Sequence, residues 1–184
     1  MSITTSPLPA LTLVVMGVSG VGKTSVAQAL VSDTHWVFQE GDELHPAANV
    51  AKMVAGHPLD DDDRWPWLRR VSEWIGIQES AGRGAVVTCS ALKRVYRDLI
   101  REGHPSVRFV HLVASEEVLT DRVTHRQGHY MPPSLLHSQL DVLEPLGMDE
   151  LGVKVEAVGI PQVVAVRALE ALRALEVTAG SGQI

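Results

Sequence analysis

The sequence contains little cysteine and no excess of basic residues, and both shortages exclude classes of protein. Cys89 is the single cysteine among 184 residues, so an internal disulfide framework is excluded and a reducing compartment is expected. Because Cys89 lies in an apolar run, we expect a buried, unreactive thiol. The chain has 16 Lys and Arg residues against 22 Asp and Glu residues, which gives a net charge of −6. No broad basic face is therefore expected for a nucleic acid or an anionic membrane, and a bound phosphate must be held locally.

Long apolar runs are also missing. The segment LPALTLVVMGV, residues 8–18, is far shorter than the roughly 20 residues of a membrane span, and no Lys or Arg precedes Lys23, as a signal peptide would require. We predict a buried strand here and expect the protein in the cytoplasm. The length and the apolar content of 45% predict one domain over residues 1–184, with flexible tails at residues 1–9 and 179–184.

Short apolar segments alternate along the chain with segments of helical period. The candidate strands are residues 11–16, 36–40, 84–89, 107–113 and 151–158. Three candidate helices have apolar faces, formed by Trp67, Leu68, Val71, Trp74, Ile75 and Gln78, by Leu92, Val95, Tyr96, Leu99 and Ile100 before Gly103, and by Val163, Leu169, Leu172 and Leu175. Continuous apolar strands separated by helices predict an α/β domain of three layers, with a parallel sheet covered on both faces.

The segment GVSGVGKTS, residues 17–25, matches the phosphate-binding pattern G-x-x-x-x-G-K-[ST] between a candidate strand and a candidate helix. Inward backbone N–H groups would hold the β-phosphate, Lys23 would neutralise phosphate oxygens, and the Thr24 hydroxyl would bind Mg²⁺. A glycine-rich turn with a solvated lysine is the alternative. The predicted nucleotide-binding residues of this loop are Gly17, Ser19, Gly20, Val21, Gly22, Lys23, Thr24 and Ser25.

A GTPase switch would need an Asn-Lys-x-Asp segment to read the base, but Asn49 is the only asparagine and Val50 follows it. Phosphotransferases, motor-type ATPases and passive nucleotide binders remain. Asp42 favours the first class, because it stands at the carboxyl end of the second candidate strand, where ligands bind in parallel sheets. Its carboxylate could accept the proton of an incoming hydroxyl, orient that hydroxyl or hold a water on Mg²⁺. A cap for a helix over residues 46–56 is the alternative.

The residues after Asp42 are rich in charge. His45 could hydrogen-bond a polyol hydroxyl, although a histidine near a helix start is often structural. Some of the aspartates at residues 60–63 are expected to cap the next helix, since Pro66 is typical of a first turn. Arg64 in that turn could offer a planar fork to a carboxylate, and a surface ion pair with an aspartate is its alternative.

Two further groups of cations are expected at the same edge of the sheet. Lys93 and Arg97 lie four residues apart near a helix start, where cations are unfavourable unless an anion is bound. They therefore indicate an anionic substrate, with solvated side chains as the alternative. Arg122 and Arg126 lie in residues 120–133, which a glycine and two prolines interrupt. This pattern favours a mobile lid that carries arginines to the phosphates; a helix-loop-helix with solvated arginines is the alternative.

Taken together, these motifs resemble the small P-loop gluconokinases of bacteria. The matching segments, spread from about residue 12 to about residue 165, are M-G-V-S-G-x-G-K-[ST] at the loop, G-D-x-x-H-P-x-x-N-x-x-K-M from Gly41, L-x-D-D-D-R-x-P-W-L from Leu59, C-S-A-L-K-x-x-Y-R-D from Cys89 and R-x-x-x-R-x-x-H from Arg122. The resemblance implies the fold of nucleoside-monophosphate and shikimate kinases, a five-stranded parallel sheet with a lid. It also implies transfer of the γ-phosphoryl group of ATP, with Mg²⁺, to the 6-hydroxyl of D-gluconate, by a protein that is commonly a homodimer.

The resemblance further implies roles for single residues. Asp42 would receive the proton of the 6-hydroxyl, while Lys23 and Arg126 would stabilise the moving phosphoryl group. Arg64 and Lys93 would meet the carboxylate of the sugar acid. The other implied contacts are Arg122 and Pro161 with the nucleotide, Thr24 with Mg²⁺, and His45, Arg97 and His129 with the substrate. A kinase for another sugar acid, shikimate or a nucleoside monophosphate, and a nucleotide-binding regulatory module without turnover, are the alternatives.

Overall fold

A parallel sheet of five strands organises the computed structural model, which describes residues 8–125 and 133–181. The strands are β1 (Thr12–Met16), β2 (Val37–Gln39), β3 (Ala85–Thr88), β4 (Val107–Val113) and β5 (Gly152–Glu156). Their order is β2-β3-β1-β4-β5, and every neighbouring pair is parallel. All the strands lie within the five ranges predicted from the sequence, and the parallel sheet is confirmed.

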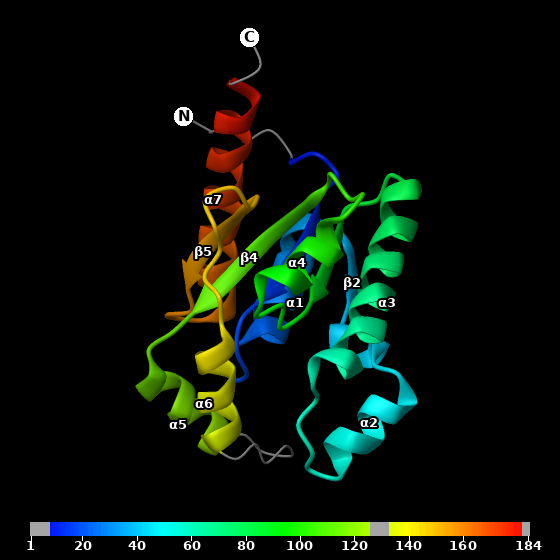
Figure 1. The fold of residues 1–184 in the computed structure, drawn as a ribbon. Coiled ribbons are helices and arrows are strands. Elements are labelled where there is room, and N and C mark those ends of the chain that lie inside the picture. Colours follow the sequence, from blue (N-terminus) through cyan, green and yellow to red (C-terminus); the bar gives the residue numbers. More distant parts are fainter. Residues whose placement is uncertain (1–7, 126–132, 182–184) are drawn as a thin grey trace.

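The helices are α1 (Lys23–Thr34), α2 (Ala47–Val54), α3 (Asp61–Ser80), α4 (Arg94–Arg101), α5 (Glu116–Thr124), α6 (Pro133–Val142) and α7 (Pro161–Ser181), with a short 3₁₀ helix, η1 (Gly41–Leu44). Strand β4 runs toward the end of the molecule where α5 and α6 lie, and α2 lies at that end too (Figure 1). This is the carboxyl edge of the sheet, where a parallel α/β domain binds its ligands.

Side chains of alternate residues on the central strands enter two separate apolar cores. One core joins Leu13, Val15, Val86, Val110 and Leu112 of the sheet to α1 and α7. The other joins Val14, Met16, Val87, Cys89 and Phe109 to α3 and α4. The sheet is thus covered on both faces, which confirms the three-layer architecture and explains why β1 and β3 are almost entirely apolar.

The start of α3 shows what the four aspartates do. Asp60 is the N-cap, its side chain accepts a hydrogen bond from the Asp63 N–H at 2.9 Å, and the Asp63 carboxylate accepts one from the Asp60 N–H at 3.0 Å. This reciprocal capping box satisfies two N–H groups at the start of the helix. The expected capping is confirmed, but Pro66 lies inside the helix rather than in its first turn.

Two details of the sequence prediction are corrected in α7. Val163 is exposed and its neighbour Val164 is buried in the core in its place, whereas Leu169 and Leu172 are buried as predicted. The helix also extends to Ser181, into the segment expected to be a flexible tail. Among the described helices, none combines the length and the apolar character required to cross a bilayer.

Candidate active site

The phosphate loop connects β1 to α1 at the carboxyl edge of the sheet. Gly22, the N-cap of α1, has a φ of 100°, a backbone conformation that favours glycine. A Cβ placed on Gly22 would have no atom of the described residues within 4 Å, so the loop is open on this side. An open concave turn at a helix N-terminus is suited to binding an anion.

Two basic side chains, those of Lys23 and Arg122, donate hydrogen bonds to backbone carbonyls of the loop. Lys23 Nζ donates hydrogen bonds to the carbonyls of Gly17 and Val18, each at 3.1 Å, so the ammonium group lies along the loop. The Arg122 guanidinium donates to the Val21 carbonyl at 3.2 Å and to the Ala157 carbonyl at 3.0 Å. Arg122 of α5 therefore connects the phosphate loop to the segment after β5, which is the position predicted for a residue near the nucleotide.

Glu40 is a residue of this site that the sequence analysis missed. Its Oε2 accepts a hydrogen bond from the Thr24 hydroxyl at 2.7 Å, and its Oε1 accepts one from the Thr88 hydroxyl. The carboxylate therefore lies beside the phosphate loop, next to the hydroxyl that was predicted to bind Mg²⁺. Its place at the end of the second strand, two residues before Asp42, is the signal that could have identified it.

The oxygen atoms of Thr24 and Glu40 are suited to Mg²⁺, which prefers hard oxygen ligands. In the part of the chain that the structure describes, no three His, Cys, Asp or Glu side chains form a metal-binding group. A hydroxyl and a single carboxylate nevertheless suit Mg²⁺, because this ion takes most of its ligands from phosphates and waters in nucleotide sites. The residues present therefore fit the predicted ion.

Asp42 is held at the carboxyl edge by the glycine before it. The Gly41 N–H donates to the Thr88 hydroxyl at 3.0 Å, and the Gly41 carbonyl accepts from Trp67 Nε1 at 2.7 Å. A Cβ on Gly41 would lie 1.8 Å from the Thr88 carbonyl oxygen, so this close approach requires glycine. The contacts fix η1 between β3 and α3 and leave the Asp42 side chain 81% exposed.

The alternative role of Asp42 as a helix cap is wrong. The N-cap of α2 is Pro46, and α2 has no side-chain cap. Burial, together with a smaller effect of Asp42, raises the pKa of the Cys89 thiol to about 12, although a backbone hydrogen bond from Ala91 and the charge of Lys23 act in the opposite direction. The expectation that Cys89 is buried is confirmed.

His45 is packed into the structure on one side and faces Asp42 on the other. Its ring stacks on Trp67 with centroids 4.2 Å apart, and Nδ1 lies 3.3 Å from the side-chain nitrogen of Asn49. Nε2 lies 4.0 Å from an Asp42 oxygen. Burial lowers the pKa of His45, Asp42 raises it and Arg64 lowers it, with a net decrease. Because the Asn49 nitrogen can only donate to Nδ1, a neutral imidazole carries its proton on Nε2 and could donate a hydrogen bond to a hydroxyl beside Asp42.

Arg64 and Lys93 come together around the carboxylate of Asp61. Lys93 Nζ lies 2.9 and 2.8 Å from the two Asp61 oxygens, the Tyr96 hydroxyl donates to Oδ1 at 2.6 Å, and Arg64 Nη1 lies 3.6 Å from the same oxygen. Arg64 Nη1 also donates to the Tyr96 hydroxyl at 3.4 Å. We call these four residues the Asp61 cluster. The structure thus brings the two predicted carboxylate-binding cations to one place.

Arg97 does not join them. Its side chain is 0% exposed and forms an ion pair with Glu150, which is equally buried, with Nε 2.6 Å from Oε1. The remaining guanidinium N–H groups donate to Glu150 Oε2 and to four backbone carbonyls, those of Ala91, Leu92, Glu144 and Pro145. Because these acceptors are all in the protein, the predicted contact between Arg97 and the substrate is wrong.

The other predicted residues are placed only in part. Pro161 is the first residue of α7, directly after the β5 segment that Arg122 contacts. Arg126 and His129 lie outside the described residues, and the same holds for half of the predicted lid, residues 126–132.

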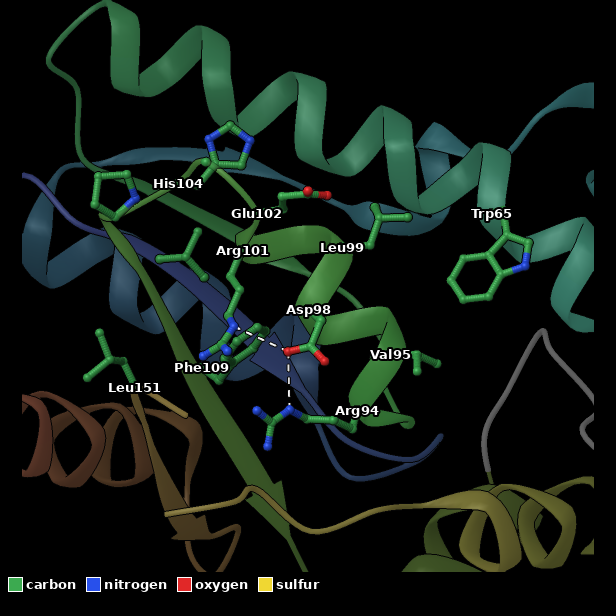
Figure 2. Close-up of a pocket in the computed structure, with 13 residues that line it drawn as sticks. Trp65, Arg94, Val95, Asp98, Leu99, Arg101, Glu102, His104, Phe109 and Leu151 are labelled. Atoms are coloured by element: carbon green, nitrogen blue, oxygen red, sulfur yellow. Dashed lines mark hydrogen bonds and ion pairs between the residues drawn. The ribbon is translucent and has the colours of Figure 1, made fainter. Parts of the chain in front are cut away.

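A surface hollow of about 940 Å³ lies on α4 and β4, away from the phosphate loop (Figure 2). Trp65, Val95 and Leu99 line one part of it, and an ion-pair chain of Arg94, Asp98 and Arg101 crosses another. None of the predicted site residues is among the lining residues, although Trp65 packs edge-on against Tyr96 of the Asp61 cluster.

Comparison with known proteins places this site in a family. The family described as AAA domain matches residues 13–146. The chain is 53% identical over 152 residues to the gluconokinase of Gluconobacter oxydans (strain 621H), which covers 83% of this chain and 85% of that protein. It is 40% identical over 148 residues to the thermoresistant gluconokinase of Escherichia coli (strain K12), and this match covers 80% of this chain and 85% of that protein.

Solved structures agree with these relatives. A gluconokinase from Sinorhizobium meliloti 1021 superimposes with a TM-score of 0.84 at 43% identity, covering 95% of this chain and 98% of that one. The shikimate kinase of Aquifex aeolicus vf5 gives a TM-score of 0.59 at 13% identity, covering 91% and 99%, and shares the fold alone. The resemblance inferred from the sequence is confirmed: the chain belongs to the gluconokinase family.

Proposed function

We propose that this protein phosphorylates D-gluconate at its 6-hydroxyl, using ATP, to give 6-phospho-D-gluconate and ADP. The observation that carries the proposal is the 53% identity to a gluconokinase over 83% of the chain. The open phosphate loop, with Lys23 along it and Glu40 beside Thr24, supports a nucleoside triphosphate as the phosphoryl donor.

Binding of the triphosphate would use the loop and the residues around it. Backbone N–H groups of the loop and the N-terminus of α1 would hold the phosphates, and Lys23 would turn from the loop carbonyls to phosphate oxygens. When bound, Mg²⁺ would offset phosphate charge, and Thr24 and Glu40 would hold it. Arg122 would border the nucleotide, together with the backbone at Pro161.

Phosphoryl transfer would take place between the loop and Asp42. The 6-hydroxyl oxygen of gluconate forms a bond to the γ-phosphorus, and the bond from that phosphorus to the oxygen bridging the β- and γ-phosphates breaks, so that ADP leaves. The hydroxyl proton passes to the Asp42 carboxylate, whose exposed side chain is free to meet a substrate. We assign stabilisation of the moving group to Lys23 and, from the sequence, to Arg126.

The sugar acid would be recognised by groups on α3 and α4. Arg64 and Lys93 would bind the carboxylate, and His45 a hydroxyl near Asp42. His129 keeps its predicted role from the sequence, whereas Arg97 is withdrawn because it is buried and fully hydrogen-bonded. Magnesium dependence, a homodimer and a cytoplasmic location belong to the same proposal as properties implied by the family resemblance.

Replacing Asp42 tests the proposed base. Asp42→Asn removes the proton acceptor but keeps the side-chain shape, so kcat with gluconate should fall by about 10²- to 10⁴-fold. The affinity for ATP should stay within about twofold, because that site lies across the cleft. Glu43→Gln, which removes a neighbouring carboxylate from η1, is the matched control and should keep its kcat. An unchanged kcat in Asp42→Asn would reject Asp42 as the base.

The acceptor is tested by coupled ADP release with gluconate, related aldonates, shikimate and AMP. We expect release with gluconate to exceed release with the other acceptors. Preference for another acceptor would reassign the substrate and retain the kinase. Absence of acceptor-dependent release would favour a regulatory nucleotide-binding module.

A further inference from the structure

The Asp61 cluster has the form of an occupied carboxylate site. An ammonium group, a phenol hydroxyl and a guanidinium group surround one carboxylate, and the closest distances are 2.6 Å from the Tyr96 hydroxyl and 2.8 Å from Lys93 Nζ. Donors of these kinds, directed at the oxygens of one carboxylate, are what recognition of an organic acid requires. Here the carboxylate comes from the protein itself.

The start of α3 does not depend on the position of the Asp61 side chain. The capping box of α3 is formed by Asp60 and Asp63, so the cap is complete without Asp61. The Asp61 side chain is 44% exposed, and those of Lys93 and Arg64 are 27% and 26% exposed. Ion pairs as open as these contribute little to folding, about 1 kcal/mol or less. The cluster is therefore accessible, and its carboxylate is held by contacts that another carboxylate could replace.

The position of the cluster connects it to the proposed reaction. Arg64 and Asp42 both act electrostatically on His45, and Nε2 of its ring lies 4.0 Å from an Asp42 oxygen. Trp67, one turn after Arg64 on α3, stacks on His45 and donates to the Gly41 carbonyl. A ligand that meets Arg64 at one end is thus directed toward Asp42 at the other.

We propose that Asp61 is a built-in competitor for the substrate carboxylate, which occupies the Arg64–Lys93 site in the empty enzyme and must leave it before a sugar acid binds. This inference rests on the proposed function, since it takes a carboxylate-bearing acceptor as given. Hydrogen bonds from Lys93 and then Tyr96 lower the pKa of Asp61, so its side chain is ionised and competes at neutral pH.

The proposed competition predicts the direction in which the KM for gluconate changes when Asp61 is replaced. If the site is open only in a fraction of molecules, the apparent dissociation constant for the sugar acid is raised by the inverse of that fraction. Asp61→Asn retains the size of the side chain but removes the charge that holds Lys93 and Arg64. We therefore expect the KM for gluconate to fall by about fivefold, a factor that corresponds to roughly 1 kcal/mol of ion pairing.

The experiment compares wild type, Asp61→Asn and Asp62→Asn by coupled ADP release at fixed ionic strength. Asp62 is exposed in the same turn of α3, so its replacement removes the same charge from the same helix end without touching the cluster. Its KM should equal that of wild type. Sodium acetate, which shares only the carboxylate with gluconate, is tested as an inhibitor against sodium chloride. It should inhibit Asp61→Asn at about fivefold lower concentration than wild type.

The outcomes separate the two proposals. A wild-type enzyme that does not phosphorylate gluconate would overturn the proposed function, whatever the variants do. A wild-type enzyme that does so, together with a KM in Asp61→Asn equal to or above that of Asp62→Asn, would overturn the competitor role alone. A higher KM in particular would show that Asp61 positions the two cations for the substrate. Should Asp61→Asn fold poorly, Asp61→Ala tests the same sign.

Discussion

Two ion-pair networks lie next to each other on α4 and differ in how far they are open to solvent. Tyr96 turns to the Asp61 cluster, where every charged side chain is partly exposed. Arg97, the next residue, turns inward to Glu150, and both members of that pair are 0% exposed. Neighbouring residues of α4 therefore belong to two different networks. Tyr96 belongs to the accessible network, which is the Asp61 cluster, and Arg97 belongs to the sealed network, which is the Arg97–Glu150 pair.

The difference shows what makes a cation available for binding. Every acceptor of Arg97 belongs to the protein, and the pair is enclosed, so the guanidinium ties α4 to the segment between α6 and β5. Lys93 and Arg64 hold a carboxylate at the surface, which solvent or a ligand can replace. Charge alone does not distinguish the networks, but burial and the supply of acceptors do.

The largest expected effect comes from breaking the sealed network. Arg97→Met leaves the buried Glu150 carboxylate with only the Gly147 N–H at 2.7 Å and Arg94 Nη1 at 3.7 Å. The free energy of unfolding should therefore fall by about 3–5 kcal/mol. The remaining folded enzyme should keep the KM for gluconate within about twofold, because Arg97 is not in the binding site. Urea unfolding and steady-state kinetics measure the two quantities. A folded, stable variant with a strongly raised KM would restore Arg97 to the substrate site.

A double variant sharpens that result. Arg97→Met with Glu150→Met removes both charges, so it should lose less stability than the two single changes added together, although four carbonyls still lose their donor. Simple addition of the single effects would mean that the pair is not coupled as the geometry indicates.

A smaller effect concerns His111, which lies on β4 beside the sealed network. Burial, together with the charges of Arg97 and Lys154, lowers the pKa of His111 to about 4, although Glu150 acts in the opposite direction. Its Nε2 is buried and has no hydrogen-bond partner within the described residues. The unfolded chain takes up this proton near pH 6.5 and the folded chain only near pH 4. Stability is therefore lost as the pH falls through that window, by up to about 3 kcal/mol.

His111→Leu should remove the His111 part of this dependence between pH 6.5 and 5, a range above the ordinary titration of carboxylates, and should leave the part that comes from His45, whose pKa is also lowered by burial. The measurement is the free energy of unfolding by urea at several pH values. His57→Gln removes an exposed histidine and is the control for the loss of one histidine. If His111→Leu keeps the slope of wild type, the buried imidazole is not its source.

Much of the fold could be predicted because its signals are local. Apolar runs within β1 and β3 are continuous since both faces of the sheet are covered, and the phosphate loop has its own pattern between a strand and a helix. The errors are local as well. Val163 and Val164 are adjacent and equally apolar, so the sequence does not show which of them meets the core. Pro66 is tolerated inside α3, where the sequence rule expects it in the first turn.

The site was less predictable because it depends on residues far apart in the chain. Nothing near Arg97 indicates that Glu150, 53 residues later, meets it. The contact between Thr24 and Glu40 likewise arises only once the sheet places the ends of β1 and β2 at the same edge. Asp61 was read as part of a helix-capping run, which is correct for Asp60 and Asp63 but not for its own side chain. The sequence shows which chemical group stands at a position, but the residues that this group contacts in the fold determine its role.

The smallest of these effects tests the accessible network. Arg64→Ala should raise the KM for gluconate about tenfold, the loss of a charge-assisted hydrogen bond worth roughly 1.5 kcal/mol, because Lys93 still holds one end of the substrate carboxylate. The free energy of unfolding should change by less than about 1 kcal/mol, in contrast to Arg97→Met, since the ion pair with Asp61 is partly exposed.

Arg64→Lys keeps the charge but not the planar fork, so its KM should lie between those of wild type and Arg64→Ala. Steady-state kinetics with gluconate and ATP varied separately measures both substrates. A change in the KM for ATP alone would show that Arg64 does not bind the sugar acid. A loss of stability as large as that of Arg97→Met would show that the Asp61 cluster, although partly exposed, stabilises the fold.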